Sequence, residues 1–183
     1  MALTSTPPPN LGDPAPTFVL PGVDGRRWDL DSARGENGLL VMFICNHCPY
    51  VKSIQEKLVR DCGRLMDHGI GSIAIMANDP TDYPEDSFEN MGKVARLYSY
   101  PFPYVIDSSQ QVAKAFGAVC TPDFFGYDRD LKLRYRGRLD AAGAKRTDEP
   151  MRRDLFEAMI QVAETGEAPA EQIPSMGCSI KWK

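Results

Sequence analysis

The sequence lacks the features that mark several large classes of protein. No run approaches the ~18 consecutive apolar residues that a membrane helix requires, and the formal net charge is only -4 over 183 residues. Such a weakly acidic chain gives no electrostatic reason to bind nucleic acid or an anionic membrane. The first ten residues, MALTSTPPPN, contain neither a basic start nor an apolar run, so we expect no secretory signal. A cytoplasmic protein is therefore expected.

Cysteine and histidine are also scarce, with five and two residues respectively. Five cysteines are too few for a secreted fold held together by disulfides, and their number is odd. The length fits a single globular domain over residues 1–183. Within it, the proline-rich residues 1–16 are expected to form an extended lead-in, and the tail at 173–183 has no assigned structure.

The hydrophobic pattern alternates between strands and helices. The runs 39–44 and 72–77 are continuously apolar, which is typical of strands buried on both faces. Between them, Val51, Ile54 and Leu58 recur at helical spacing. The full pattern predicts strands at 18–20, 26–30, 39–44, 72–77, 104–107, 124–127 and 131–135, and helices at 49–67, 84–98, 109–116 and 151–165. This order indicates an α/β fold with a central mixed sheet, helices on both faces and an N-terminal hairpin.

The chemistry is concentrated in a CxxC motif, Cys45 and Cys48, where the strand 39–44 meets the following helix. Reactive groups collect at this edge of an open α/β sheet, and a helix N-terminus favours the thiolate over the thiol. The spacing brings both sulfurs to one face within bonding reach. Their disulfide would close a very short loop, which favours a reversible switch over a structural staple. His47 lies between them and, as imidazolium, would stabilise a thiolate further.

The motif leaves open which cysteine is the nucleophile. Pro49 fits the first position of a helix, which makes Cys48 the N-cap and exposes it to more of the helix dipole. Cys45 is expected to be the more exposed sulfur. Cys45 is therefore expected to attack a bulky disulfide and Cys48 a small oxidant.

Several segments resemble the thioredoxin superfamily, and more narrowly its peroxiredoxin-like branch, related to alkyl hydroperoxide reductase and thiol-specific antioxidant proteins. They are DPAPTF at 13–18, DGRRWDL at 24–30, LLVMFICNHCPYVK at 39–52 and CTPDFFGYD at 120–128. The resemblance implies a thioredoxin fold with CxxC redox chemistry and a cis-proline beside the active site, which here would be Pro122. Thr121 and Pro122 would then position a substrate chain that pairs with the exposed backbone edge next to them.

Other residues are secondary candidates. Asn78 follows the strand 72–77 and is expected either to line the substrate pocket or simply to form a turn. Cys120 lies close to the expected cis-proline, where a packed thiol and a third redox role are about equally favoured. Cys178, in the tail, would be either a resolving thiol for Cys120 or idle. Cys62 falls on the apolar stripe of a helix and is expected to be buried.

The chain departs in two respects from the families that it resembles. Peroxiredoxins carry a Thr or Ser three positions and a Pro seven positions before the peroxidatic cysteine, and the absence of this pattern here disfavours efficient peroxidase activity. The matching positions are Cys45 and Val41 counted from Cys48, and Met42 and Gly38 counted from Cys45. Thioredoxin's buried acid is replaced by Leu39, so His47 or water would have to handle protons.

These observations favour a thiol-disulfide oxidoreductase that needs no cofactor. Its partners would be protein or small-molecule disulfides and an unidentified thiol reductant. One alternative is a thiol-dependent peroxidase, in which peroxide oxidises Cys48 and Cys45 resolves it. Another is a metal-binding protein that uses the cysteine pair and His47, but zinc would need a second close pair of ligands, which the sequence lacks. We therefore expect no metal.

Overall fold

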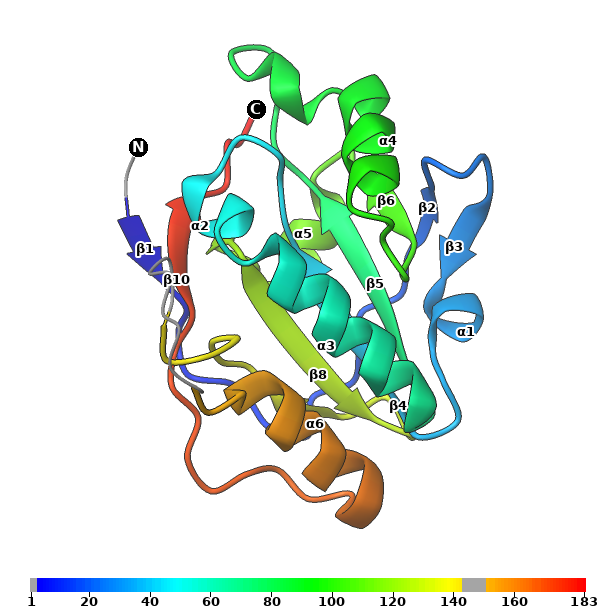
Figure 1. Cartoon of the computed structure of the whole chain (residues 1–183), viewed down its shortest axis with the longest axis vertical. Helices are drawn as coiled ribbons and strands as arrows, with labels where there is room; N and C mark the ends of the chain where they lie inside the picture. Colours follow the sequence, from blue (N-terminus) through cyan, green and yellow to red (C-terminus); the bar gives the residue numbers. More distant parts are fainter. Residues whose placement is uncertain (1–2, 143–150) are drawn as a thin grey trace.

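The computed structural model describes residues 3–142 and 151–183, and a five-stranded sheet of order β6-β5-β4-β8-β9 forms its centre (Figure 1). β4 runs parallel to β5, and β5 parallel to β6, whereas β8 pairs antiparallel with both β4 and β9. The strands are β4 (Gly38–Phe43), β5 (Ile70–Met76), β6 (Tyr104–Ile106), β8 (Asp123–Asp128) and β9 (Leu133–Tyr135). The predicted mixed sheet is thus confirmed.

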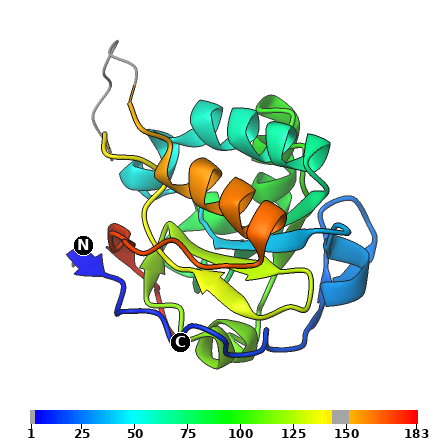
Figure 2. The ribbon, with the colours of Figure 1, turned by 90° about the horizontal axis from the view of Figure 1, so that it is seen from below.

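Helices cover both faces of this sheet, which explains the unbroken apolar run of β4. Leu40 and Met42 pack into the core on the side of α3 and α6, whereas Leu39 and Val41 pack into the core on the side of α5. Figure 2 shows these helices on opposite sides of the sheet. Their bounds are α3 (Gln55–Asp67), α4 (Phe88–Leu97), α5 (Gln111–Phe116) and α6 (Asp154–Thr165). Within the described ranges, no helix has the length and apolarity to cross a membrane.

Two predicted helices are each divided at a serine. The helix expected at 49–67 consists of α2 (Pro49–Lys52) and α3, and the hydroxyl of Ser53 donates to the carbonyl of Tyr50 at 2.9 Å at the break. Such a bond competes with the helical backbone pattern. The helix expected at 84–98 consists of the 3₁₀ turn η1 (Pro84–Asp86) and α4, whose N-cap is Ser87. The sequence pattern does not reveal either break.

The N-terminal hairpin is confirmed as β2 (Val19–Pro21) and β3 (Arg27–Asp29), which pair antiparallel. A one-turn helix, α1 (Leu30–Ala33), follows directly, and its first residue is the last one of the strand expected at 26–30. It begins at a capping box, in which Asp29 accepts from the backbone of Ser32 and the Ser32 hydroxyl accepts from the backbone of Asp29. Local capping is enough to form this short helix.

The two ends of the chain meet in a second sheet of order β1-β10-β7. β1 (Leu3–Ser5) lies in the proline-rich lead-in, β10 (Met176–Ser179) in the unassigned tail, and β7 (Cys120–Thr121) between them in sequence. None of these strands was predicted, because each is too short to show an alternating pattern. Their pairing brings the tail to the edge of the sheet at which β4 ends (Figure 1).

Candidate active site

The cysteine pair lies directly after β4, where the chain turns into α2. Cys48 is the N-cap of α2 with an extended backbone, and Pro49 occupies the first turn, as the sequence predicted. The geometry follows from proline, which lacks the N–H that an interior helical position would use and keeps the preceding residue extended. Cys45 is 1% exposed and Cys48 0% exposed. Both sulfurs are therefore covered, and the described structure shows no appreciable difference in accessibility between Cys45 and Cys48.

Cys48 is the sulfur whose surroundings favour the thiolate. A thiol hydrogen bond from Cys45 lowers the pKa of Cys48 to about 4, and further hydrogen bonds from Cys178 and from the backbone of Val51 act in the same direction against the cost of burial. The Sγ atoms of Cys48 and Cys178 are 2.9 Å apart, and the Cys48 Sγ also lies 3.2 Å from the carbonyl oxygen of Thr121. Thiol and backbone donors thus converge on this sulfur, whereas the carbonyl of Thr121 is an acceptor that favours the protonated form of Cys48.

Cys45 has the opposite environment. Its hydrogen bond to Cys48, its burial and the nearby carboxylate of Asp86 all raise its pKa well above the ordinary thiol value. The hydroxyl of Thr121 lies 3.2 Å from its Sγ. The pair therefore divides into a thiolate at Cys48 and a thiol at Cys45, which donates to it.

His47 does not face open solvent but packs between Tyr83 and Asp86. Its ring stacks on that of Tyr83 with centroids 4.1 Å apart, and its Nδ1 lies 2.6 Å from Oδ2 of Asp86. The side chains of His47 and Asp86 are 5% and 0% exposed. The His47 Nε2 is buried and has no hydrogen-bond partner among the described residues. One imidazole nitrogen is thus anchored and the other is left available.

Asp86 is the residue that sequence reasoning missed. Its Oδ1 accepts from the backbone N–H groups of Asn46 at 2.7 Å and His47 at 3.1 Å, and its Oδ2 accepts from Nδ2 of Asn78 at 2.9 Å. The sequence PED at 84–86 indicated only an acidic helix start. No local signal could have linked it to a motif some forty residues earlier.

Cys45, His47 and Asp86 are also the set that could hold a metal ion. One ligand atom from each lies within 4.8 Å of the others, and all three residues are buried. Sulfur, imidazole and carboxylate donors suit zinc, but a structural zinc site has four protein ligands. Three are present in this group.

Asn78 is placed at the site but not as a free substrate contact. Its Nδ2 donates to Asp86, and its Oδ1 accepts from the backbone N–H of Lys181 at 2.9 Å. The backbone of the next residue, Asp79, donates to the carbonyl of Lys181 at 2.8 Å. The expectation that Asn78 lines an open substrate pocket is therefore corrected, because its amide ties the C-terminal segment to Asp86.

The peptide bond between Thr121 and Pro122 is cis, as the resemblance implied. The backbone edge beside it is not open, however. In β7, Thr121 pairs antiparallel with Cys178 of β10, and Cys120 pairs with Ser179. The tail occupies the edge at which a substrate chain was expected to pair. In the described structure the substrate edge is filled from within the molecule.

The neighbours of the accessory cysteines Cys120 and Cys178 differ from those expected from the sequence. Cys178 lies against Cys48, whose Sγ is 2.9 Å from its own, whereas its expected role as a resolving thiol for Cys120 stays a prediction. Cys120 is paired with Ser179, one position further along the strand, and its Sγ lies 3.7 Å from the carbonyl of Pro122. Successive side chains of a strand alternate between its faces, which separates Cys120 from Cys178. Burial raises the pKa of each to about 12.

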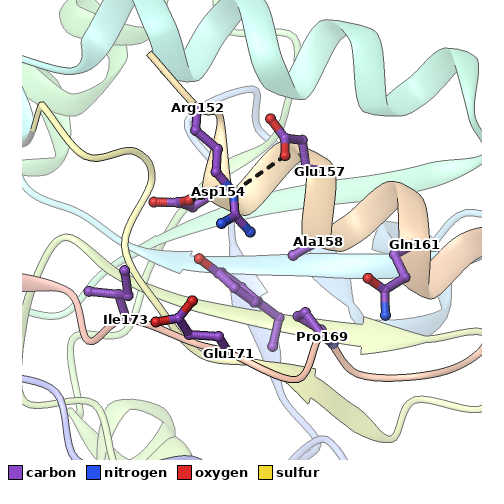
Figure 3. A pocket seen from close by; sticks show the side chains of 9 residues that line it. Arg152, Asp154, Glu157, Ala158, Gln161, Pro169, Glu171 and Ile173 are labelled. Carbon is purple, nitrogen blue, oxygen red and sulfur yellow. Dashed lines mark ion pairs between the residues drawn. The ribbon is translucent and has the colours of Figure 1, made fainter.

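Cys62 is buried in α3, as predicted, and burial raises its pKa to about 12. A separate hollow of about 100 Å³ lies between α6 and the chain at 169–173, and Figure 3 shows the side chains that line it. Its charged lining includes Arg152, Asp154 and Glu157, joined by ion pairs from Arg152. None of the described residues that line it is a cysteine.

The sequence matches one protein-family model and several curated proteins. The family model described as AhpC/TSA matches residues 11–136. A thiol-disulfide oxidoreductase ResA from Bacillus thuringiensis subsp. konkukian is 27% identical over 130 residues. The match covers 67% of this chain and 66% of ResA, so the chain spans slightly under two thirds of that relative's length.

Solved structures show the same fold. An uncharacterized conserved protein from Geobacillus kaustophilus is 45% identical, with a TM-score of 0.93, over 100% of this chain and 97% of its own. A hypothetical protein from Sinorhizobium meliloti 1021 is 40% identical, with a TM-score of 0.92, over 98% of both chains. The thioredoxin domain of a thiol-disulfide oxidoreductase from Bacteroides vulgatus is 17% identical, with a TM-score of 0.58, over 70% of this chain and 89% of that domain. The last of these shows that the fold is thioredoxin-like.

Proposed function

The chain belongs to the AhpC/TSA family, and from that premise we propose that it is a thiol-disulfide oxidoreductase whose Cys45–Cys48 pair alternates between dithiol and disulfide. The observation that carries the proposal is the convergence of thiol and backbone donors on Cys48, which lowers its pKa to about 4. A thiolate is the nucleophile of thiol-disulfide exchange. The similarity to ResA supports the same reaction class.

In the proposed cycle, Cys48 replaces Cys45, the nucleophile expected from the sequence, because the pKa of Cys48 is lowered and that of Cys45 is raised. The Cys48 thiolate attacks one sulfur of a substrate disulfide. A mixed disulfide forms, and the first substrate sulfur leaves as a thiolate. Cys45 then loses its proton and attacks Cys48, which releases the second substrate sulfur and leaves the Cys45–Cys48 disulfide. An external dithiol returns the two electrons by the reverse steps.

The second step needs a base, because the pKa of Cys45 is raised. We assign this role to the imidazole of His47, held by Asp86 through Nδ1. One ligand atom of each of these three residues lies within 4.8 Å of the others, a separation that one water molecule can bridge for proton transfer. The buried acid that the sequence lacked at Leu39 is thus supplied by Asp86 from a different element.

Reduction of insulin disulfides, with dithiothreitol as the electron source, tests the proposal. The Cys48→Ser variant is expected to lose all activity above the dithiothreitol background, since it lacks the thiolate. The matched control is Cys62→Ala, which removes another buried thiol outside the site and is expected to keep wild-type activity. Equal rates for the wild type and Cys48→Ser would reject the proposal.

The two alternatives have less support. The hydroxyl of Thr121 lies 3.2 Å from the Sγ of Cys45, and among the described residues no hydroxyl is hydrogen-bonded to Cys48, the sulfur with the lowered pKa. The hypothesis of a metal site is supported by one group of three possible ligands, one fewer than a structural zinc site has. We expect the protein to consume peroxide no faster than a free thiol does. We also expect elemental analysis of the purified protein to find no stoichiometric zinc.

The natural substrates under this proposal are protein or small-molecule disulfides, with a cellular dithiol as reductant. We place the protein in the cytoplasm, a reducing compartment. The small, odd number of cysteines supports this proposal, because it does not fit a secreted fold held together by disulfides.

A further inference from the structure

The C-terminal strand lies across the cysteine pair and carries a cysteine of its own. β10 runs beside α2, between β1 and β7 (Figure 1). Cys178, at 3% exposure, points to the same side of the strand as its pairing partner Thr121, toward Cys48. The two Sγ atoms are 2.9 Å apart, well inside ordinary contact between sulfurs, so less than about 1 Å of movement separates them from bonding distance.

This placement is specified by the sequence around Cys178. A Cβ atom at Gly177 would overlap the carbonyl oxygen of Thr121, so only glycine lets β10 approach β7 this closely. The hydroxyl of Ser175 donates to the carbonyl of Pro122 at 2.8 Å, and the backbone N–H of Ile180 donates to Val119 at 3.2 Å. Bonds on both sides of Cys178 thus fix its register against the active site.

The geometry also matches that of a docked peptide. A substrate chain would pair antiparallel with the backbone edge beside the cis-proline and present its sulfur to the reactive cysteine. β10 does both, because it pairs with Thr121 and puts its own thiol against Cys48. The tail therefore occupies the substrate position with a substrate-like residue.

We infer that Cys178 is a second, intramolecular disulfide partner of Cys48, so that the oxidised protein exists as two disulfide isomers. This inference rests on the proposed function and extends it. In the first route, the Cys178 thiolate attacks Cys48 of the Cys45–Cys48 disulfide. The Cys48–Cys178 bond forms, the Cys45–Cys48 bond breaks, and Cys45 leaves as a thiolate that takes up the proton lost by Cys178. No oxidant is consumed.

In the second route, Cys178 resolves a mixed disulfide on Cys48. The Cys48–Cys178 bond forms, and the substrate sulfur leaves as a thiolate that takes the proton of Cys178. The substrate disulfide gains two electrons over the whole sequence, and the two protein thiols lose them. The product fastens β10 to the start of α2 and leaves Cys45 as a free thiol.

Glutathione disulfide is a suitable probe, because one half of it stays on the attacked cysteine until a second thiol displaces it. The Cys45→Ser variant is treated with glutathione disulfide and its intact mass is measured. The expected product has lost two hydrogens and carries no glutathione, because Cys178 resolves the adduct. In Cys45→Ser/Cys178→Ser the adduct on Cys48 cannot be resolved, so the glutathionylated fraction is expected to be about tenfold larger.

Peptide mapping identifies the bond. Trypsin releases Cys45 and Cys48 in the peptide 35–52, Cys178 in 154–181, Cys62 in 61–64 and Cys120 in 115–129. In oxidised Cys45→Ser we expect 35–52 linked to 154–181. The same linked pair is expected as a fraction of the oxidised wild type, so the inference can be tested without any substitution.

The outcomes separate the inference from the proposed function. If the wild type forms the Cys45–Cys48 disulfide and reduces insulin, but Cys45→Ser keeps its glutathione as the double variant does, the inference is wrong and the proposed function stands. If 35–52 is linked to 115–129 instead, Cys120 is the partner and the inference is also wrong. If neither the wild type nor any variant reacts with glutathione disulfide, the proposed function fails first.

Discussion

The Nδ1 of His47 lies 2.6 Å from Oδ2 of Asp86, so the histidine between the two cysteines is bound to a carboxylate on a different element, η1. The other oxygen of Asp86 accepts the backbone N–H groups of Asn46 and His47. One fully buried carboxylate therefore determines both the loop between the two cysteines and the orientation of the imidazole. This explains how an acid far away in sequence serves the cysteine pair.

The first prediction concerns Asp86→Asn. The amide keeps the shape of the carboxylate but loses the charge that faces several N–H donors, and hydrogen bonds to charged groups contribute about 1.5–3 kcal/mol each. We expect the free energy of unfolding to fall by about 3 kcal/mol, measured by urea denaturation. The rate of Cys45–Cys48 disulfide formation should also fall, since His47 loses its anchor.

Asp82→Asn is the matched control, because Asp82 is exposed on the loop just before η1. It removes the same charge from the same region and should change neither stability nor rate by more than experimental error. Equal effects of the two substitutions would show that only net charge matters, and would contradict the role given to Asp86.

The second prediction concerns the pH dependence of Cys48. Hydrogen bonds from Cys45 and Cys178 lower its pKa to about 4. Under conditions in which the protein stays folded, the rate of alkylation of Cys48 by iodoacetamide should therefore stay constant as the pH is lowered to about this value. In Cys45→Ala the largest of these contributions is gone, and the midpoint should move up toward the ordinary thiol value. Mass spectrometry of the peptide 35–52 reads the modified fraction. A midpoint unchanged by the substitution would contradict the assignment.

The same pKa sets a stability prediction for the reduced protein. The pKa of Cys48 is lower in the folded state than the ~8.5 of an unfolded thiol, so the unfolded chain binds more protons between these values. The free energy of unfolding should therefore increase as the pH rises above about 4, and this added stability is lost again when the pH falls below about 4. In Cys48→Ser the contribution should vanish, which urea titrations at several pH values will measure.

Much of the fold could be predicted from the sequence because its signals are local. The continuous apolar run of β4 is explained by burial on both faces, and Pro49 alone fixes Cys48 as an N-cap. The helix breaks at Ser53 and Ser87 could not be predicted, since a single side-chain hydrogen bond decides each. Strand β10 was missed because its four residues are specified by their partners and not by their own pattern.

The site divides in the same way. Cys45, Cys48 and the cis-proline Pro122 are marked by spacing and resemblance, and all lie together in the structure. Asp86 and Cys178 are joined to them only by the fold. The edge expected to receive substrate is filled by β10, which no reasoning on separate segments could reveal.

The third prediction concerns the ion pair behind the cis-proline. Asp123 is fully buried and receives the Nε of Arg136 at 3.2 Å and its guanidinium Nη2 at 2.9 Å. Arg136→Met should destabilise the protein by about 3–5 kcal/mol, because a buried carboxylate loses its only guanidinium partner among the described residues. The double variant Arg136→Met/Asp123→Leu should recover most of this loss, since no charge is left unpaired. Urea denaturation of both variants measures the difference, and a double variant as unstable as the single one would contradict the account.

The fourth prediction concerns Gly177, where the tail crosses the active site. An added Cβ would overlap the carbonyl oxygen of Thr121 and lie 3.1 Å from Cδ of Pro122, so β10 must shift away from β7 in Gly177→Ala. We expect a loss of about 1–3 kcal/mol in the free energy of unfolding, measured with urea. Faster alkylation of Cys48 is also expected, since the covering strand is loosened.

Gly63→Ala is the control for this substitution, because a Cβ at Gly63 would meet nothing within 4 Å in the middle of α3. There alanine should stabilise the helix by up to about 1 kcal/mol and leave the alkylation rate of Cys48 unchanged. The two glycine substitutions should therefore move stability in opposite directions. The close approach of Gly177 to Thr121 is what holds β10 over Cys48 in this account. If Gly177→Ala stabilised the protein, or left Cys48 as protected from alkylation as in the wild type, β10 would not be the element that covers the site.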